Sequence, residues 1–451
     1  MRKVKRKRPL VSSVLKEHFG NSELHQLVTA TREYPATARL DLQVAVADVL
    51  SGPLEPKKLL GAHAFHGGFE TITFSHLLVE GESAVLVAPL QYDEIDAGEA
   101  VPARCLKNAL WLGEDGMLPF ALFLSRVQKY GRPAGLHLEF AVPPGEPGVQ
   151  LSRRLLDQIE RKVAQAGSYR GKVLSLETSD NYSGAVEAIR VHRLSPVQRD
   201  QVILPERTLK LLERNVTQFI EQRDKLNLMR LGVKKGLLFY GPPGTGKTHT
   251  IRYLASQMKD HTTLLITADQ MAYLDEYIQL ARFLQPAMVV IEDVDLIARA
   301  RTSMRNPCEE SLLNRLLNEM DGLREDARVL FVLTTNRPDQ LEETLTSRPG
   351  RIDQAIEFPL PDEDGRRKLI LLYSGGMKLD GELLSLLVMK SKGGSGAFIK
   401  ELMRRSAQFL IESGQPDLTV DHVEAALDEL LFSGGKLNAQ LLGFSQKNQT
   451  A

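Results

Sequence analysis

One stretch of this 451-residue sequence reads Gly241-Pro242-Pro243-Gly244-Thr245-Gly246-Lys247-Thr248. It matches the phosphate-binding pattern G-x-x-x-x-G-K-[ST], and it stands between a predicted strand at Gly236–Tyr240 and a predicted helix, as this motif requires. Its glycines let successive backbone N–H groups converge on a phosphate at a helix N-terminus, where the dipole favours negative charge. We therefore predict that residues 241–249, His249 included, bind ATP. Lys247 would reach the β and γ oxygens, and Thr248 would hold Mg²⁺.

Two further polar groups follow predicted strands of the same sheet. Glu292 and Asp293 come directly after Met288–Ile291, and Asn336 comes shortly after Val329–Leu333. Carboxylates at the carboxyl end of a buried strand beside a phosphate loop are suited to handling the metal and the attacking water. By position Glu292 is expected to hold hydrated Mg²⁺ and Asp293 to polarise the water.

The rest of the second half fits an α/β fold. Strands alternate with helices from about Ser195, with a further strand at Thr263–Thr267, which is typical of a parallel sheet. No strand is predicted after Pro359-Leu360-Pro361. Four helices are expected there, the last with Thr419 as its N-cap: Glu363–Tyr373, Glu382–Lys390, Ala397–Glu412 and Val420–Leu431. We predict a P-loop NTPase sheet over residues 194–361, a helical lid over 362–434 and a flexible tail over 435–451.

Residues 1–193 form a separate predicted α/β or α+β domain of unknown function, beginning with a basic tail at 1–9. Leu151, Leu155, Ile159 and Val163 recur at helical spacing and predict an amphipathic helix. Trp111 lies in an apolar run and is expected in the core. The predicted strands of this half are Glu70–Leu77, Ser83–Leu90, Leu136–Val142 and Val173–Leu176, and Leu118–Val127 is apolar but ambiguous.

Composition excludes several classes of protein. The 57 basic and 57 acidic residues give a net charge of zero, which argues against a surface built for polyanions. The basic N-terminus leaves a nucleic acid open as a partner, but nothing else indicates one. Cys105 and Cys308 are too few for a disulfide framework. The apolar runs are too short to span a membrane, so we expect a cytoplasmic protein without a membrane partner.

Several motifs together resemble the AAA ATPase family over residues 200–432. Besides the phosphate loop they include Leu312–Gly322, Phe358–Asp362 and the loop Ser347–Asp353. The Glu-Asp order at 292–293, in a motif that resembles Walker B, is similar to that of the mitochondrial AAA translocase of the Rieske protein. The resemblance implies that Asn336 acts as sensor 1 and that Gly396 and Ala397 form the sensor 2 turn.

The same resemblance implies that Arg348 and Arg351 act as arginine fingers on a neighbouring subunit's nucleotide. It therefore implies a homo-oligomeric ring, a hexamer by analogy, that hydrolyses ATP and remodels or translocates a protein partner recruited by residues 1–193.

One family feature has no clear match. The segment that would carry a pore loop for gripping substrate contains Met271 and Tyr273 but lacks the expected glycine. Tyr273 is as well explained by helix packing as by substrate contact. Two other functions therefore stay open: an ATP-dependent assembly switch with slow turnover that regulates a partner, and a nucleic-acid motor.

Overall fold

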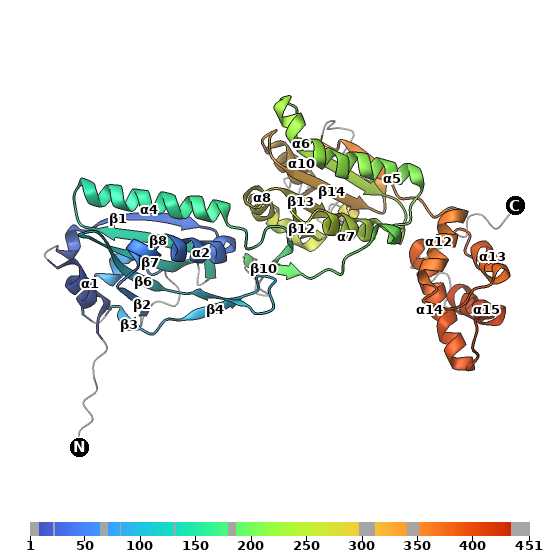
Figure 1. The fold of residues 1–451 in the computed structure, drawn as a ribbon, viewed down its shortest axis with the longest axis horizontal. Helices are drawn as coiled ribbons and strands as arrows, with labels where there is room; N and C mark the ends of the chain where they lie inside the picture. The colour runs from blue at the N-terminus through green and yellow to red at the C-terminus, as the bar shows by residue number, and fades with distance from the viewer. Residues whose placement is uncertain are drawn as a thin grey trace, which may run out of the picture. The chain divides into compact units, whose positions relative to one another are not determined.

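The computed structural model describes residues 9–20, 23–63, 71–81, 83–129, 132–178, 186–296, 312–340 and 351–433. Residues 1–8 of the predicted basic tail, the whole predicted tail 435–451, and the residues Arg348 and Cys308 lie outside these ranges. The chain divides into two compact units, residues 1–193 and 194–451. Each unit is described by itself (Figure 1).

The N-terminal unit is built on an antiparallel sheet. Its strand order is β1-β8-β7-β6-β2-β3, and every neighbouring pair runs antiparallel. The strands are β1 (Val28–Tyr34), β2 (Lys58–His63), β3 (Leu86–Ala88), β6 (Ala109–Asp115), β7 (Leu118–Lys129) and β8 (Arg132–Val142). Two smaller antiparallel pairs join β4 (Tyr92–Ile95) to β5 (Ala103–Leu106), and β9 (Val173–Thr178) to β10 (Val186–His192).

Helices bury the faces of this sheet. In α4 (Glu146–Gln165) the predicted stripe Leu151, Leu155, Ile159 and Val163 is buried, so the amphipathic helix is confirmed. Helix α1 (Val11–Phe19) joins a core cluster that includes residues of β6 and β7, while α2 (Arg39–Val49) packs with α4. Trp111 on β6 is buried, as expected.

The strand predicted at Glu70–Leu77 is wrong. Phe74–Leu77 form the short helix α3, in which Phe74 and Leu77 are buried three residues apart on one face. The backbone N–H of Phe74 donates to Glu139 Oε2 at 2.7 Å. This carboxylate and the cap residue Thr73 satisfy the free donors of the first turn, which favours a helix over a strand.

A parallel sheet forms the centre of the C-terminal unit. The strands β11 (Lys235–Tyr240), β12 (Thr262–Ile266), β13 (Ala287–Ile291), β14 (Val329–Thr335) and β15 (Gln354–Glu357) lie in the order β12-β13-β14-β11-β15. Strands β13 and β14 are buried throughout, as expected when helices cover both faces of a parallel sheet. Those helices include α7 (Lys247–Gln257), α8 (Leu274–Phe283) and α10 (Leu312–Asp321).

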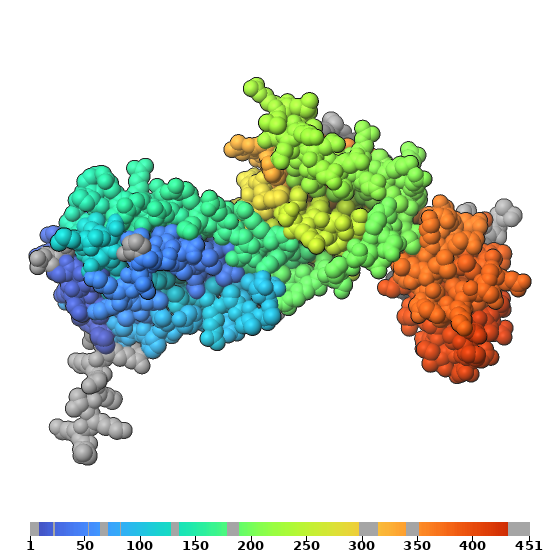
Figure 2. Space-filling model, viewed as in Figure 1, coloured from blue at the N-terminus to red at the C-terminus, as the bar shows by residue number. Residues whose placement is uncertain are grey.

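A nearly continuous helical run precedes the first of these strands (Figure 1). It consists of α5 (Glu206–Leu212), the π-helical turn η5 (Glu213–Thr217) and α6 (Gln218–Leu228). The end of α6 projects from the surface of this unit (Figure 2). Leu228 and Met229 at this end are 84% and 70% exposed.

Helices alone form the lid: α12 (Glu363–Tyr373), α13 (Gly381–Lys390), α14 (Gly396–Ser413), α15 (Val420–Asp428) and a final π-helical turn η8 (Glu429–Ser433). Side-chain oxygens cap the first three. Asp362 accepts from Gly365 N at 2.8 Å, Asp380 from Leu383 N at 2.7 Å and Ser395 from Phe398 N at 3.2 Å. Thr419 stands at the N-cap of α15, as predicted.

Candidate nucleotide site

The phosphate loop connects β11 to α7 and depends on its glycines. Gly241, Gly244 and Gly246 have φ angles of 147°, 75° and 98°, a region that side chains other than glycine rarely adopt. Two of them also lie against other segments. A Cβ at Gly241 would stand 2.2 Å from Phe358 O, and one at Gly244 would stand 2.8 Å from Ala397 Cβ. The loop is therefore packed on both the β15 edge and the lid.

Lys247 is the first residue of α7, and it is buried. Its Nζ donates to Gly241 O at 2.7 Å and to Pro242 O at 2.9 Å. Burial lowers the pKa of Lys247 to about 8, while Asp293 and Asp295 oppose that shift. The ammonium thus lies inside the loop, where two neutral carbonyl oxygens accept its hydrogen bonds. This environment suits a phosphate oxygen.

The two residues predicted to hold Mg²⁺ lie together. Thr248 Oγ1 donates to Glu292 Oε1 at 2.7 Å. A hydroxyl and a carboxylate are hard oxygen ligands, and Mg²⁺ is usually bound through one or two such groups plus phosphates and water. These two side chains fit Mg²⁺ bound together with a nucleotide.

Asp293 and Asn336, which were expected at the same edge of the sheet, are in direct contact. Asn336 Nδ2 donates to Asp293 Oδ1 at 2.9 Å, and the backbone N–H of Asp293 donates to Thr334 Oγ1 at 3.0 Å. Asp293 has a φ of 50°, which is uncommon for a residue other than glycine. Burial raises the pKa of the Asp293 carboxyl, and the nearby Asp295 and Glu292 add to the rise.

Asp295 is a site residue that the sequence reasoning missed. It is buried, and its Oδ1 accepts from Thr335 Oγ1 at 2.9 Å and from Asn336 N at 3.2 Å. Asp295 therefore fixes the turn that positions Asn336. In the sequence, its position two residues after Asp293 was the signal that could have identified Asp295 as a site residue.

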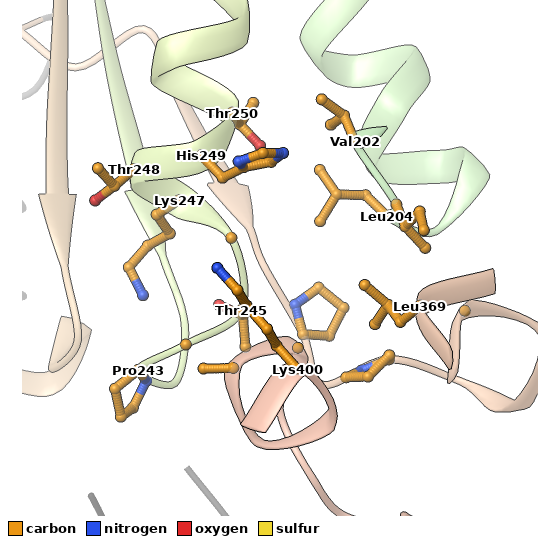
Figure 3. Close-up of a pocket in the computed structure, with 18 of the residues that line it drawn as sticks. Val202, Leu204, Pro243, Thr245, Lys247, Thr248, His249, Thr250, Leu369 and Lys400 are labelled. Atoms are coloured by element: carbon orange, nitrogen blue, oxygen red, sulfur yellow. The ribbon is translucent and has the colours of Figure 1, made fainter. Parts of the chain in front are cut away.

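A cavity of about 410 Å³ lies beside the loop. This volume falls in the usual range for small-molecule sites. Four parts of this unit line it: the stretch before α5, the phosphate loop with His249, the strand-end residues Asp293, Thr334 and Asn336, and the lid with the segment that leads into it. His249 Nε2 is 3.1 Å from Gln201 O. Figure 3 shows Lys400 extending from the lid toward the loop, with Leu204 and Leu369 on the apolar side.

Sequence reasoning did not find the apolar lining Val202–Pro205 or the lid residues Leu369, Tyr373 and Lys400. The run Val202-Ile203-Leu204-Pro205 just before a helix was a weak signal, because it reads equally as ordinary core.

The lid contacts the loop through the expected turn. Gly396 and Ala397 open α14 and line the cavity, and Ala397 N donates to Gly244 O at 3.1 Å. Phe398, in the first turn of α14, is fully buried in the lid core.

Other predicted residues are not brought to the cavity. Arg351 Nη2 contacts Asp321 Oδ2 at 2.5 Å and Asn318 Oδ1 at 3.3 Å within its own chain, so its role as an arginine finger stays a prediction. Arg348 lies outside the described residues. Met271 is buried in the core and Tyr273 is half-buried.

No helix in the described ranges is both long and apolar enough to cross a membrane.

Comparisons with known proteins agree with this geometry. Residues 237–360 match the family described as ATPase family associated with various cellular activities (AAA). The chain is 30% identical over 260 residues to the proteasome-activating nucleotidase of Methanothermobacter thermautotrophicus, covering 54% of this chain and 63% of that protein. It is 32% identical over 202 residues to the 26S proteasome regulatory subunit S10B homolog B of Arabidopsis thaliana, covering 41% and 50%.

A third relative is the ATP-dependent zinc metalloprotease FtsH of Thermus thermophilus, 29% identical over 238 residues, with 49% of this chain and 38% of that protein covered. The chain thus spans between 38% and 63% of the length of these relatives. The matched residues contain the phosphate loop, the carboxylate pair and Asn336 described above. The C-terminal unit of this chain therefore carries an AAA ATPase domain.

Proposed function

We propose that this protein hydrolyses ATP between the subunits of a homo-oligomeric ring, a hexamer by family resemblance. It uses the cycle to remodel or translocate a protein partner recruited by residues 1–193. The observation that carries the proposal is the convergence of Lys247, the Thr248–Glu292 pair and the Asp293–Asn336 pair at one edge of a parallel sheet.

Each residue has a distinct proposed role. Lys247 binds phosphate oxygens, and Thr248 and Glu292 hold Mg²⁺, which when bound neutralises phosphate charge. Asp293 accepts a hydrogen bond from the attacking water, and Asn336 orients that carboxylate through its 2.9 Å hydrogen bond. His249 and the turn at Gly396 and Ala397 close the cavity around the nucleoside.

The lid contact supports a cycle coupled to motion. Because Ala397 N donates directly to Gly244 O, a change in the loop on binding or losing a phosphate moves the start of α14. Closure of a lid over bound substrate commonly shields the reaction from water and completes the catalytic site. The exposed apolar end of α6, with Leu228 and Met229, supports contact with another protein surface.

Mixing two inactive variants tests the ring. Lys247→Ala removes the phosphate-binding ammonium. Arg348→Ala removes a predicted arginine finger but leaves the phosphate loop of the same subunit intact. Neither variant alone should hydrolyse ATP at an appreciable rate. If the finger acts on a neighbour, mixed rings regain part of the activity, because intact loops then face intact fingers. Absence of any regain in co-assembled rings, or full activity of either variant alone, contradicts the proposal.

A second function, an assembly switch with slow turnover, is favoured by one observation. Asp293 is one methylene shorter than glutamate, and Asn336 engages its Oδ1, which limits its reach toward a water. In that case Asp293→Asn leaves ATP-dependent assembly unchanged in light scattering. Rapid wild-type turnover under the same conditions would exclude the switch.

A further inference from the structure

A second cavity lies on the C-terminal unit, away from the nucleotide site. Its volume is about 580 Å³, and it lies between the helical run η5–α6 and the starts of β11 and β15. Lys235 opens β11, whereas the phosphate loop follows the other end of that strand at Tyr240. Six strand residues separate the two sites by about 20 Å. The residues lining this second cavity are Leu211, Arg214, Asn215, Gln218, Phe219, Gln222, Lys235 and Gln354.

The lining is cationic and rich in amides. It contains two cations, Lys235 and Arg214, four primary amides and no acidic residue. Lys235 Nζ donates to Asn215 Oδ1 at 2.9 Å and lies 4.4 Å from the centre of the Phe219 ring. These contacts hold the ammonium at the cavity wall.

Neither cation is neutralised by a contact. Among the described residues, the ion pairs of this region involve Arg199, Lys210 and Lys234, and none involves Lys235 or Arg214. Burial lowers the pKa of Lys235 and Arg214 lowers it further, although Asp353 opposes both. The Asp353 carboxylate itself accepts from Gly236 N at 2.7 Å. The half-buried ammonium therefore carries a charge that an incoming anion would stabilise.

We propose that this cavity binds an oxyanion, a carboxylate or a phosphate, between Lys235 and Arg214. The guanidinium can donate two parallel hydrogen bonds to either group, and the amides of Gln218 and Gln222 in the lining can supply neutral donors around it. The π-helical turn η5 supports a ligand site, because it places Arg214 and Asn215 at the cavity and such turns are frequent at functional sites.

Titration with two probes tests the proposal and identifies the source of the anion. A capped triglutamate peptide represents an acidic protein segment, and inorganic phosphate represents a free ion. Isothermal titration calorimetry of the whole protein should show saturable binding of at least one probe. The phosphate loop also takes phosphate, so only the part lost in Lys235→Gln is assigned to this cavity.

Lys235→Gln and Arg214→Gln should each weaken that binding by about tenfold, because each removes a charged donor. Lys235→Arg should retain it. The matched control is Lys234→Gln, since the neighbouring Lys234 is paired with Glu325 at 2.8 Å outside the cavity. ATP hydrolysis serves as a separate readout of the nucleotide site. Arg214 is exposed, so its variant should fold even if Lys235→Gln does not.

Binding of only one probe supports the proposal and names the source of the anion. The proposal is overturned if wild type binds neither probe saturably. It is also overturned if both charge-removing variants bind them as wild type does.

Discussion

Asn336 contacts the carboxylate of Asp293, the proposed catalytic group, and is itself held by the buried carboxylate of Asp295. Its Nδ2 donates to Asp293 Oδ1 at 2.9 Å, while its backbone N–H donates to Asp295 Oδ1 at 3.2 Å. Because the backbone of Asn336 is fixed, its side chain can orient Asp293 at little entropic cost. Under the proposed mechanism, catalysis depends on this amide, which makes one hydrogen bond to the Asp293 carboxylate.

We predict that Asn336→Ala lowers kcat by about 10²-fold, the lower end of what a positioned acid–base group contributes. The KM for ATP should change little, because phosphate binding rests on the loop. Steady-state ATPase kinetics measure both constants. Asn227→Ala, on the exposed surface of α6, is the control and should match wild type. A rise in KM without a fall in kcat would instead make Asn336 a binding residue.

Gly244 combines backbone strain with a steric limit. Its φ is 75°, and an added Cβ would lie 2.7 Å from Ser395 Oγ and 2.8 Å from Ala397 Cβ. Ser395 caps α14, so neither neighbour can move without disturbing the start of that helix. Gly414 has a similar φ of 65° but nothing within 4 Å of its Cβ position.

Alanine substitutions at these two glycines separate the cost of backbone strain from the cost of steric crowding. Gly414→Ala should cost only the left-handed backbone penalty of about 1 kcal/mol. Gly244→Ala should cost clearly more, since the lid must also shift away from the loop. Chemical denaturation without nucleotide measures both free energies of unfolding. Equal costs would show that the lid accommodates the methyl group and that the loop–lid contact is loose.

At the scale of elements, one buried pair joins α6 to the start of β12. Arg223 Nε donates to Val233 O at 3.1 Å, and its Nη1 lies 3.4 Å from His261 Nε2. Burial, together with the neighbouring Arg223 guanidinium, lowers the pKa of His261 to about 4. Neutral His261 can accept from Arg223, whereas protonated His261 would place two buried cations together.

This pair predicts an acid-sensitive contribution to stability. The folded pKa of His261 is about 4, below the ordinary histidine value of 6.5, so the unfolded chain binds more protons between these values. Stability therefore falls as pH drops from about 6.5 to about 4, by up to about 3 kcal/mol. His261→Gln should remove this part of the pH dependence. Urea denaturation of both proteins across this range measures the difference, and parallel curves would contradict the assignment.

The spacing of apolar residues predicted those helices and strands whose burial is determined by their own sequence. The stripe of α4 and the apolar strands β11, β13 and β14 were found because burial repeats along each segment. Strand β15 was missed, since only Ile356 of its four residues is buried. It becomes a strand by pairing with β11, which no local pattern reports.

The residues of the candidate site likewise fall into those that local sequence predicts and those that only tertiary packing brings together. Lys247, Thr248, Glu292 and Asn336 were predicted, because motif spacing and strand ends place polar groups at one sheet edge. Tyr373 and Lys400 were not, since they reach the cavity only through the packing of the lid on the loop. Local sequence can identify chemistry that one loop carries. It does not identify a cavity wall that several distant segments form together.

For the whole molecule, the central question is whether Arg351 serves its own chain or a neighbour. Its side chain is 15% exposed and contacts Asp321 at 2.5 Å, so it is engaged within its own chain here. A finger acting in trans must leave Asp321 when subunits assemble. Substituting Asp321 then frees the Arg351 guanidinium to reach a neighbouring subunit, whereas substituting Arg351 removes that guanidinium.

The two substitutions therefore give opposite expectations for catalysis. If Arg351 acts on a neighbour's nucleotide, Arg351→Ala should lower kcat by about 10³-fold, as loss of such fingers does in other NTPases. Asp321→Ala should retain most of the rate, although both variants lose the same ion pair and some stability. ATPase assays over a range of protein concentrations, with light scattering to follow assembly, compare them directly. Equal losses of rate in both variants, tracking equal losses of stability, would assign the pair to folding and leave Arg348 as the candidate finger.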